Sequence, residues 1–400
     1  LNHAAVNPLF SFMEAATHQE DIATRYRYME EKDADGIFRQ MTYTSLRPDA
    51  ERKDYNVVLI CLEGFSKYIM EEKGHVKGVT PNLDRLTREG IYFSNIYANS
   101  FRTDRAMVAV MSALPAQPTM SVMDMTRIST SLPSLAGALG KNGYDTHFYY
   151  GGDANYSNMK SYLMGTGFQN VTHQFDFDKK LQTGKWGVAD GPVYDRLLAD
   201  IKAFDPKKRF MKMMMTGSSH EPFDVPDYHK MKQPELNAFS YADYHLGRFI
   251  TELKKLPQWK NTLVVIVPDH LGCWPQKIDN YKLWRYEIPL VMLGGMFSEP
   301  RDVETIGGQI DIPATVLAML GMQHDEFLYS KDLLDSEAPH FAFFTFPDAM
   351  GLIDSTGYVI FDNTQKTVAA SSKDKAVDDR TKKAKAYLQK LYDDLGERNN

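Results

Sequence analysis

The chain has 400 residues, of which 43% are hydrophobic, so it can bury a large core as one domain or as one domain with a small appendage. Its formal net charge of -6 comes from 46 basic and 52 acidic residues, which argues against the basic surface that nucleic acids need, and we expect no nucleic-acid partner. The only two cysteines, Cys61 and Cys273, exclude a disulfide framework.

The N-terminal residues 1–50 are mixed and polar, and we interpret them as an arm with a helix over 21–40. No run of eighteen apolar residues occurs in the chain, so none of it is expected to span a membrane. Because the chain begins at Leu1 rather than at Met, we expect a signal, an anchor or a membrane domain upstream. The arm would connect that segment to the rest of the chain.

A short apolar run over 57–62, Val-Val-Leu-Ile-Cys-Leu, is typical of a strand that is buried on both faces of a parallel sheet. Similar runs recur along the chain with helix-like stretches between them, and this alternation predicts an α/β fold with a doubly wound, mostly parallel sheet. We place this α/β domain at 51–335. Its further predicted strands lie at 144–150, 209–215, 263–267 and 288–293, and predicted helices lie at 132–142 and 192–204.

The pattern changes after about residue 335. Short runs at 341–346, 358–361 and 367–370 predict a small antiparallel sheet, and the charged amphipathic stretch 378–395 predicts a closing helix. Residues 336–400 are therefore predicted to form a C-terminal subdomain.

Three potential metal ligands directly follow predicted strands. Glu63 ends the first apolar run, and Asp269 and His270 follow the strand at 263–267. Ligands of doubly wound sheets bind beyond the carboxyl ends of the strands, where a buried carboxylate must be paired, protonated or bound to a metal. Glu63 could instead cap a helix or make a hydrogen bond in its loop. Two ligands side by side at Asp269 and His270 favour a divalent metal site.

Thr103 precedes a predicted helix at 104–113. It could be an ordinary helix cap, and the same position places its oxygen where the free N–H groups of a helix favour an anion. A metal bound to this oxygen would lower its pKa and turn the hydroxyl into a nucleophile, so we include Thr103 among the ligands. Arg102 and Arg105 could bind a phosphate, or could be surface or structural cations.

His220 lies in a turn-rich segment, 216–223, directly after the predicted strand at 209–215. A histidine there could protonate a leaving oxygen or bind a phosphoryl oxygen. The alternative is a hydrogen-bonded loop histidine. The residues alone leave both roles of His220 open.

Together these segments resemble the extracellular domain of the lipoteichoic acid synthase-like phosphoglycerol transferases, within the alkaline phosphatase and sulfatase superfamily. The resemblance covers most of residues 55–335, and the order, spacing and strand-end positions of its motifs all agree. These motifs lie at 56–63, 78–86, 101–107, 218–223, 267–270, 287–290 and 309–315.

The resemblance implies that His220 contacts the substrate, and it also implies a mechanism and its partners. Thr103 would attack the phosphorus of a phospholipid head group, and the resulting phosphothreonine would pass its phosphoryl group to a glycan, a glycerol phosphate or water. One divalent ion would assist, manganese by preference, with magnesium or zinc as alternatives. The catalytic domain would lie outside the cell membrane, in the periplasm or at the cell exterior.

One motif departs from the family pattern. Members that polymerise glycerol phosphate carry Trp-Asn-Arg where this chain has Ser157, Asn158 and Met159. Only Asn158 is retained, and we predict that it contacts the substrate. The exact lipid donor therefore stays open.

Other functions of the same fold are alternatives. A phosphoethanolamine transferase would also use a threonine nucleophile, and a hydrolase would act on a phosphate or sulfate ester. A true sulfatase matures a Cys or Ser within Cys/Ser-x-Pro-x-Arg, and residues 103–107 have neither that residue nor the proline. A domain that binds head groups or glycans without turnover is the non-enzymatic alternative.

Overall fold

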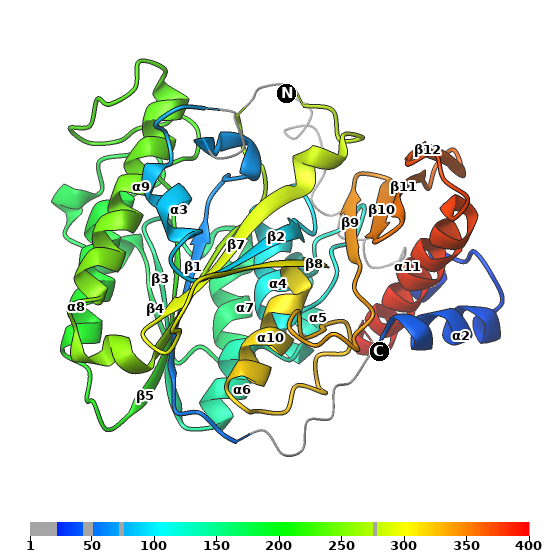
Figure 1. Cartoon of the computed structure of the whole chain (residues 1–400), viewed down its shortest axis with the longest axis horizontal. Helices are drawn as coiled ribbons and strands as arrows, with labels where there is room; N and C mark the ends of the chain where they lie inside the picture. The colour runs from blue at the N-terminus through cyan, green and yellow to red at the C-terminus, as the bar shows by residue number, and fades with distance from the viewer. Residues whose placement is uncertain (1–21, 43–50, 72–75, 275–277, 400) are drawn as a thin grey trace, which may run out of the picture.

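The computed structural model describes residues 22–42, 51–71, 76–274 and 278–399. A sheet of eight strands forms the centre of the molecule (Figure 1). The strands are β1 Asn56–Leu62, β2 Ile91–Tyr97, β3 Tyr144–Tyr150, β4 Asn170–Thr172, β5 Arg209–Met215, β6 Thr262–Pro268, β7 Glu287–Gly294 and β8 Arg301–Gly308.

The strand order is β4-β3-β5-β1-β6-β7-β2-β8. All neighbouring strands from β4 to β6 pair in parallel, as do β2 and β8, whereas β7 is antiparallel to both β6 and β2. This arrangement confirms the predicted mostly parallel sheet.

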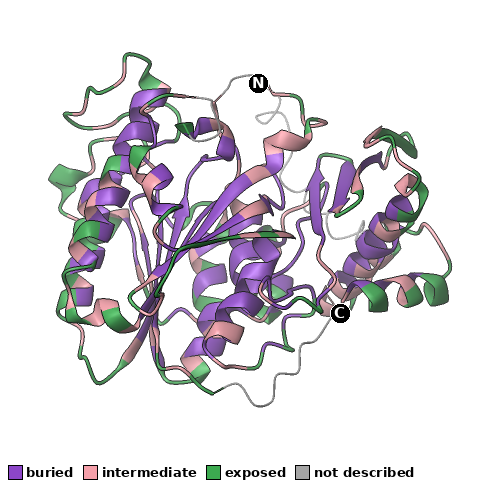
Figure 2. Cartoon of the chain, viewed as in Figure 1, coloured by how far each residue is buried: buried purple, intermediate pink, exposed green. Residues whose placement is uncertain are grey.

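Helices cover both faces of the sheet, so its central strands are buried throughout (Figure 2). Side chains of β1 alternate between two cores, with Val57 and Leu59 on one face and Val58 and Ile60 on the other. This burial on both faces is why β1 is a continuous apolar run. The first face packs against α4 Thr103–Ser112, α5 Thr126–Ser131, α6 Leu135–Lys141, α7 Met159–Thr166 and α10 Ile312–Met319, and the second against α3 Pro81–Leu86, α8 Asp190–Lys202 and α9 Pro234–Leu253.

The C-terminal residues form a separate antiparallel sheet of four strands in the order β12-β11-β10-β9, which packs beside the closing helix α11 (Figure 1). The strand β9 lies beside the segment that leads from β2 to α4, because the Thr345 N–H donates to the carbonyl of Asn99 at 3.0 Å. No helix in the described ranges is both long and apolar enough to cross a membrane. The bounds are β9 Ala342–Phe346, β10 Ala349–Asp354, β11 Gly357–Asp362, β12 Thr367–Ser371 and α11 Val377–Asn399.

The helix predicted over 21–40 is shorter than expected, because in the described part of this range the α-helix α2 spans only Glu31–Met41. The backbone before it bonds to α11 instead: the N–H of Tyr28 donates to Gln389 Oε1 at 2.9 Å, and Gln389 Nε2 donates to the carbonyl of Met29 at 3.1 Å. Tertiary contacts therefore replace helical hydrogen bonds there, and the described arm packs on the C-terminal subdomain.

Three neighbouring parallel strands end at one edge of the sheet. Cys61 in β1 pairs with Met215 in β5, and Leu62 in β1 pairs with Pro268 in β6. The residues that follow β1, β5 and β6 are therefore neighbours in space although they are far apart in the sequence. This register places the candidate site.

His147 in β3 predicts a pH dependence of stability. Burial lowers its pKa from 6.5 to about 4, so the folded state favours the neutral imidazole. The contribution of neutral His147 to the free energy of unfolding is complete above pH 6.5, and it is lost as the pH falls from 6.5 to about 4. We expect that His147→Gln flattens the fall in the free energy of unfolding between these pH values, measured by urea unfolding. An unchanged slope in the variant would contradict this assignment.

Candidate active site

The structure brings four of the predicted site residues together at the carboxyl edge of the sheet. The hydroxyl oxygen of Thr103 lies 3.2 Å from Glu63 Oε2, 3.0 Å from Asp269 Oδ2 and 3.3 Å from His270 Nε2. Glu63 follows β1, Asp269 and His270 follow β6, and Thr103 begins α4. One hydroxyl therefore contacts two carboxylates and one imidazole.

These side chains form a donor set that can hold one divalent ion. Ligand atoms of Glu63, Asp269 and His270 all lie within 4.8 Å of one another. His270 Nδ1 lies 3.0 Å from the carbonyl of Leu271, which fixes the proton on Nδ1 and leaves the Nε2 lone pair for a metal. Two carboxylates, one imidazole and a hydroxyl suit manganese, magnesium or zinc.

The Asp269 carboxylate is held in place by the backbone. Its Oδ1 accepts hydrogen bonds from the N–H groups of Gly64 and His270, both at 2.7 Å, so Oδ2 is left to contact Thr103. Two backbone donors on one oxygen fix the direction of the other. The backbone therefore fixes the position of Asp269 Oδ2 beside Thr103.

The two buried carboxylates repel each other. Burial, and then the charge of Asp269, raise the pKa of Glu63 well above its ordinary value, while the Thr103 hydroxyl lowers it. A cation bound between Glu63 and Asp269 would relieve this repulsion, so the electrostatics of the site also fit a metal ion.

Two glycines allow the ligand loops to approach closely. Gly64 has φ of +71°, and the Gly272 N–H donates to its carbonyl at 2.9 Å. A Cβ atom at Gly272 would lie 2.8 Å from the Gly64 Cα, closer than real Cβ atoms come. Side chains at these two positions would push apart the loops that carry Glu63 and Asp269.

The nucleophile candidate is the first residue of its helix. Arg102 is the N-cap, with φ of -140°, and the first helical bond runs from the Ala106 N–H to the Arg102 carbonyl at 3.1 Å. The side chain of Thr103 is therefore not the cap, and it is directed to the carboxylates instead. The first amide N–H groups of α4 lie at its positive end, where an anion is favoured.

An open cavity of about 260 Å³ lies over Thr103. Predicted substrate contacts Arg102 and His220 line it, and both are exposed. His220 Nδ1 lies 3.0 Å from the carbonyl of Glu221, which leaves Nε2 free. Aromatic side chains form much of the remaining wall. The whole lining consists of Glu63, Phe101, Arg102, Thr103, Asp104, Tyr150, Tyr156, Ser157, Met159, Trp186, His220 and His270.

Two further predicted contacts, Arg105 and Asn158, do not line this cavity. Arg105 is buried, with its guanidinium 5.1 Å from the centre of the Phe101 ring, and burial lowers its pKa. Asn158 is exposed at the start of α7, with φ of 56°. Substrate binding by either residue has no support from the cavity geometry.

The sequence analysis missed Gln309, which connects the segment before Thr103 to the segment that carries Asp269. Its buried amide donates to the carbonyls of Pro268 and Asp269 at 2.7 and 2.6 Å, and its oxygen accepts from the Asn99 N–H at 2.9 Å. The only sequence signal was its place at the start of the motif 309–315. Gln309 therefore fixes the backbone of Asp269 relative to the chain that leads to Thr103.

We expect Gln309→Leu to lower turnover by about 10- to 100-fold, because supporting hydrogen bonds that orient metal ligands have effects of this size. Gln389→Leu is a matched control, since Gln389 is an equally buried amide that bridges the arm to α11. Both variants should lose similar stability in thermal unfolding, and only Gln309→Leu should lose turnover of the metal-loaded protein. Equal activity losses would assign Gln309 a purely structural role.

The chain is similar to known proteins over most of its length. A family model described as Sulfatase matches residues 55–322. Phosphoglycerol transferase I of Xanthomonas campestris pv. campestris is 26% identical over 328 residues, which are 75% of this chain and 46% of that protein. The chain spans about half the length of the curated relatives it matches.

Two crystal structures share the fold over almost their full length. A protein in the alkaline phosphatase superfamily from Vibrio parahaemolyticus has a TM-score of 0.80 and 25% identity, over 92% of this chain and 98% of that one. Lipoteichoic acid synthase LtaP from Listeria monocytogenes has a TM-score of 0.74 and 21% identity, over 93% of this chain and 99% of that one. These matches confirm the resemblance found in the sequence.

Proposed function

The chain belongs to the sulfatase family, and on that premise we propose that it is a metal-dependent phosphotransferase. It moves a phosphoglycerol-type head group from a phospholipid to an acceptor through a phosphothreonyl intermediate at Thr103. One observation carries this proposal: the Thr103 hydroxyl lies within 3.3 Å of Glu63, Asp269 and His270 at the helix N-terminus. Relatives named phosphoglycerol transferase and lipoteichoic acid synthase support the head-group class.

Glu63, Thr103, Asp269 and His270 would hold one divalent ion, manganese by preference, with magnesium or zinc as alternatives. The ion would lower the pKa of the Thr103 hydroxyl and offset the negative charge that develops on the phosphoryl group. The ligand atoms of Glu63, Asp269 and His270 are already close together, so binding of the ion would require little rearrangement of the site.

Residues around the cavity would carry out the attack on phosphorus, the proton transfer and the binding of the phosphate. The Thr103 hydroxyl loses its proton to solvent in the open cavity, and Oγ1 attacks phosphorus while the bond from phosphorus to the lipid oxygen breaks. The amide groups that begin α4 face the phosphoryl oxygens. His220, with Nε2 free, donates a proton to the leaving oxygen or binds a phosphoryl oxygen. Arg102 in the cavity wall attracts the phosphate.

In the second step an acceptor hydroxyl attacks the phosphothreonine and restores Thr103. The acceptor would be a glycan or a glycerol phosphate, and water in its place would make the protein a hydrolase. The lipid donor requires access to a membrane, so we assign the catalytic domain to the outer side of the cell membrane, in the periplasm or at the cell exterior.

A panel of phospholipids tests this function. Metal-loaded protein should release phosphoglycerol from a glycerol-headed lipid, and metal removal by a chelator should stop the release. Preferential release of phosphoethanolamine would favour that alternative transferase, and release that no acceptor accelerates would favour a hydrolase. If metal-loaded protein releases no head group from any lipid, the proposal fails.

A further inference from the structure

We propose that Trp186 is the specificity-determining wall of the Thr103 cavity, against which the neutral polyol part of a substrate packs. The inference rests on the proposed function and names the chemistry that its site selects. The polyol is either the glycerol of the donor head group or the hydroxyl-rich carbon framework of the acceptor.

A tight turn displays Trp186. The N–H of Gly184 donates to the carbonyl of Gly187 at 3.2 Å, and the N–H of Gly187 donates back at 3.1 Å, so Lys185 and Trp186 form the tip between them. Gly187 has φ of +88°, and a Cβ atom there would lie 2.4 Å from the carbonyl oxygen of Gly151. The turn is therefore pressed against the end of β3 in a conformation that requires glycine.

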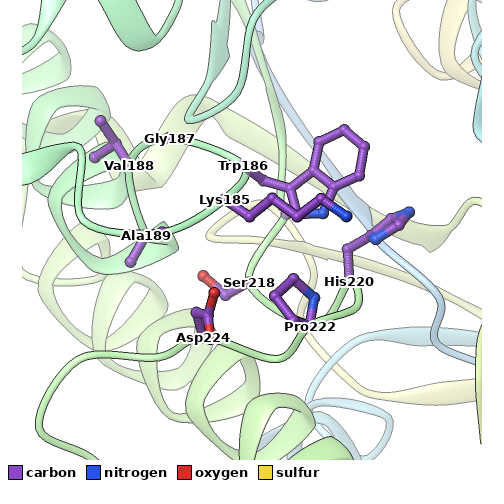
Figure 3. A pocket seen from close by; sticks show the side chains of 11 residues that line it. Lys185, Trp186, Gly187, Val188, Ala189, Ser218, His220, Pro222 and Asp224 are labelled. Carbon is purple, nitrogen blue, oxygen red and sulfur yellow. The ribbon is translucent and has the colours of Figure 1, made fainter.

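The indole is fixed from three sides. Its Nε1–H donates to the carbonyl of Glu221 at 2.6 Å, the His220 ring lies 4.4 Å away at 54°, and the Tyr156 ring lies 6.2 Å away at 77°. Figure 3 shows the indole beside the His220 ring. Its only polar atom is satisfied, yet the side chain is partly exposed. A rigid, half-exposed aromatic ring binds a ligand with little loss of side-chain entropy.

The position of Trp186 gives it access to substrate. Trp186 and His220 line the Thr103 cavity, and both also line a smaller pocket that includes Ser218 and Asp224 (Figure 3). The two rings therefore lie between the Thr103 cavity and the smaller pocket. A group attached to the phosphorus atom at Thr103 lies within the cavity whose wall they form.

The charges around the indole select a neutral partner. An aromatic face alone would also suit an ammonium group. Here Lys185 Nζ already lies 5.7 Å from the indole centre and occupies the place that a ligand ammonium group would take at the ring, whereas the charge of Arg102 in the cavity lining is paired with Asp104 at 3.6 Å. The C–H groups of a polyol can pack on the ring, while Ser157 and Asp104 in the lining can bond its hydroxyl groups.

Steady-state kinetics separate the two sources of the polyol. We expect Trp186→Ala to raise the KM by about tenfold with kcat within about twofold, because uniform binding is lost. Trp186→Phe should keep most of the affinity. A rise in the KM for a glycerol-headed lipid with water as acceptor assigns the contact to the donor, and a rise only in the KM for a sugar acceptor assigns it to the acceptor. Trp259→Phe, which lies outside the cavity lining, is the matched control.

Fluorescence provides a readout that needs no turnover. Glycerol phosphate should quench the wild-type tryptophan emission, and the quenching should disappear in Trp186→Phe and persist in Trp259→Phe. Phosphoethanolamine should quench at least tenfold more weakly. Equal or tighter binding of phosphoethanolamine would overturn the neutral-polyol assignment.

The two proposals fail in different ways. If no lipid is turned over by the wild type, the proposed function fails, whatever the fluorescence shows. If lipid is turned over but Trp186→Ala changes neither KM and neither ligand quenches Trp186, the inference alone is wrong.

Discussion

Replacing Thr103 with alanine should lower head-group release by at least about 10³-fold, because removal of a nucleophile abolishes the covalent pathway. The substitution removes the one oxygen that contacts Glu63, Asp269 and His270 together. Release should be measured under single-turnover conditions with saturating metal. Thr103→Ser keeps a hydroxyl at the same position and should retain measurable activity.

Thr80→Ala is a matched control, since Thr80 also lies at a helix N-terminus, where it is buried and its hydroxyl donates to Asp84 Oδ2 at 2.9 Å. Its activity should stay close to that of the wild type, even if its melting temperature falls. Should Thr103→Ala keep more than about one tenth of the wild-type rate, a nucleophile other than Thr103 would be required.

Glu63→Gln should lower activity without lowering the stability of the metal-free protein. Turnover and metal affinity should each fall by at least about 100-fold, since one anionic ligand is lost. Without metal, the free energy of unfolding should stay constant or rise by about 1 kcal/mol, because the variant removes the repulsion between two buried carboxylates. Thermal unfolding in chelator and in saturating Mn²⁺ measures both effects.

Asp243→Asn provides the contrast. Asp243 is also a buried carboxyl group whose pKa burial raises, to about 6, but it caps the chain at Asn82 and Leu83. Its variant should keep the full stabilisation by Mn²⁺. If Glu63→Gln gains as much stability from Mn²⁺ as the wild type does, Glu63 is not a metal ligand.

Continuous apolar runs predicted the central strands well, because β1, β5 and β6 are buried on both faces. The same signal could not find β8, an edge strand with exposed charged residues such as Arg301 and Asp302. β2 mixes polar Ser94 and Asn95 into its middle, where its register shifts. β2 and β8 are stabilised by pairing with neighbouring strands that are distant in the sequence, so the local sequence pattern does not predict them.

Glu63, Asp269 and His270 could be predicted from their positions directly after strands, because neighbouring parallel strands end at one edge of a sheet. Gln309 could not be predicted in this way, because its hydrogen-bond partners Asn99 and Asp269 are 210 and 40 residues away in the sequence. The place of Trp186 in the cavity wall could not be predicted either, although the sequence shows a tryptophan between two glycines.

The two arginines beside Thr103 illustrate a different limit. Arg102, before the first helical residue, lines the cavity, whereas Arg105, within α4, is buried beside Phe101. Charge and proximity in the sequence suggested phosphate binding for both. The direction of each side chain depends on where the helix begins, and the sequence predicted that boundary one residue too late.

Mass spectrometry of the trapped enzyme tests the central claim most directly. Metal-loaded protein would be mixed with a glycerol-headed phospholipid without acceptor, quenched in acid and digested. We predict that the peptide containing Thr103 gains the mass of one phosphoglycerol group, located on Thr103 by fragmentation, and that added acceptor removes it. An unmodified Thr103 in protein that turns the lipid over, or the same group on another residue, would contradict the account.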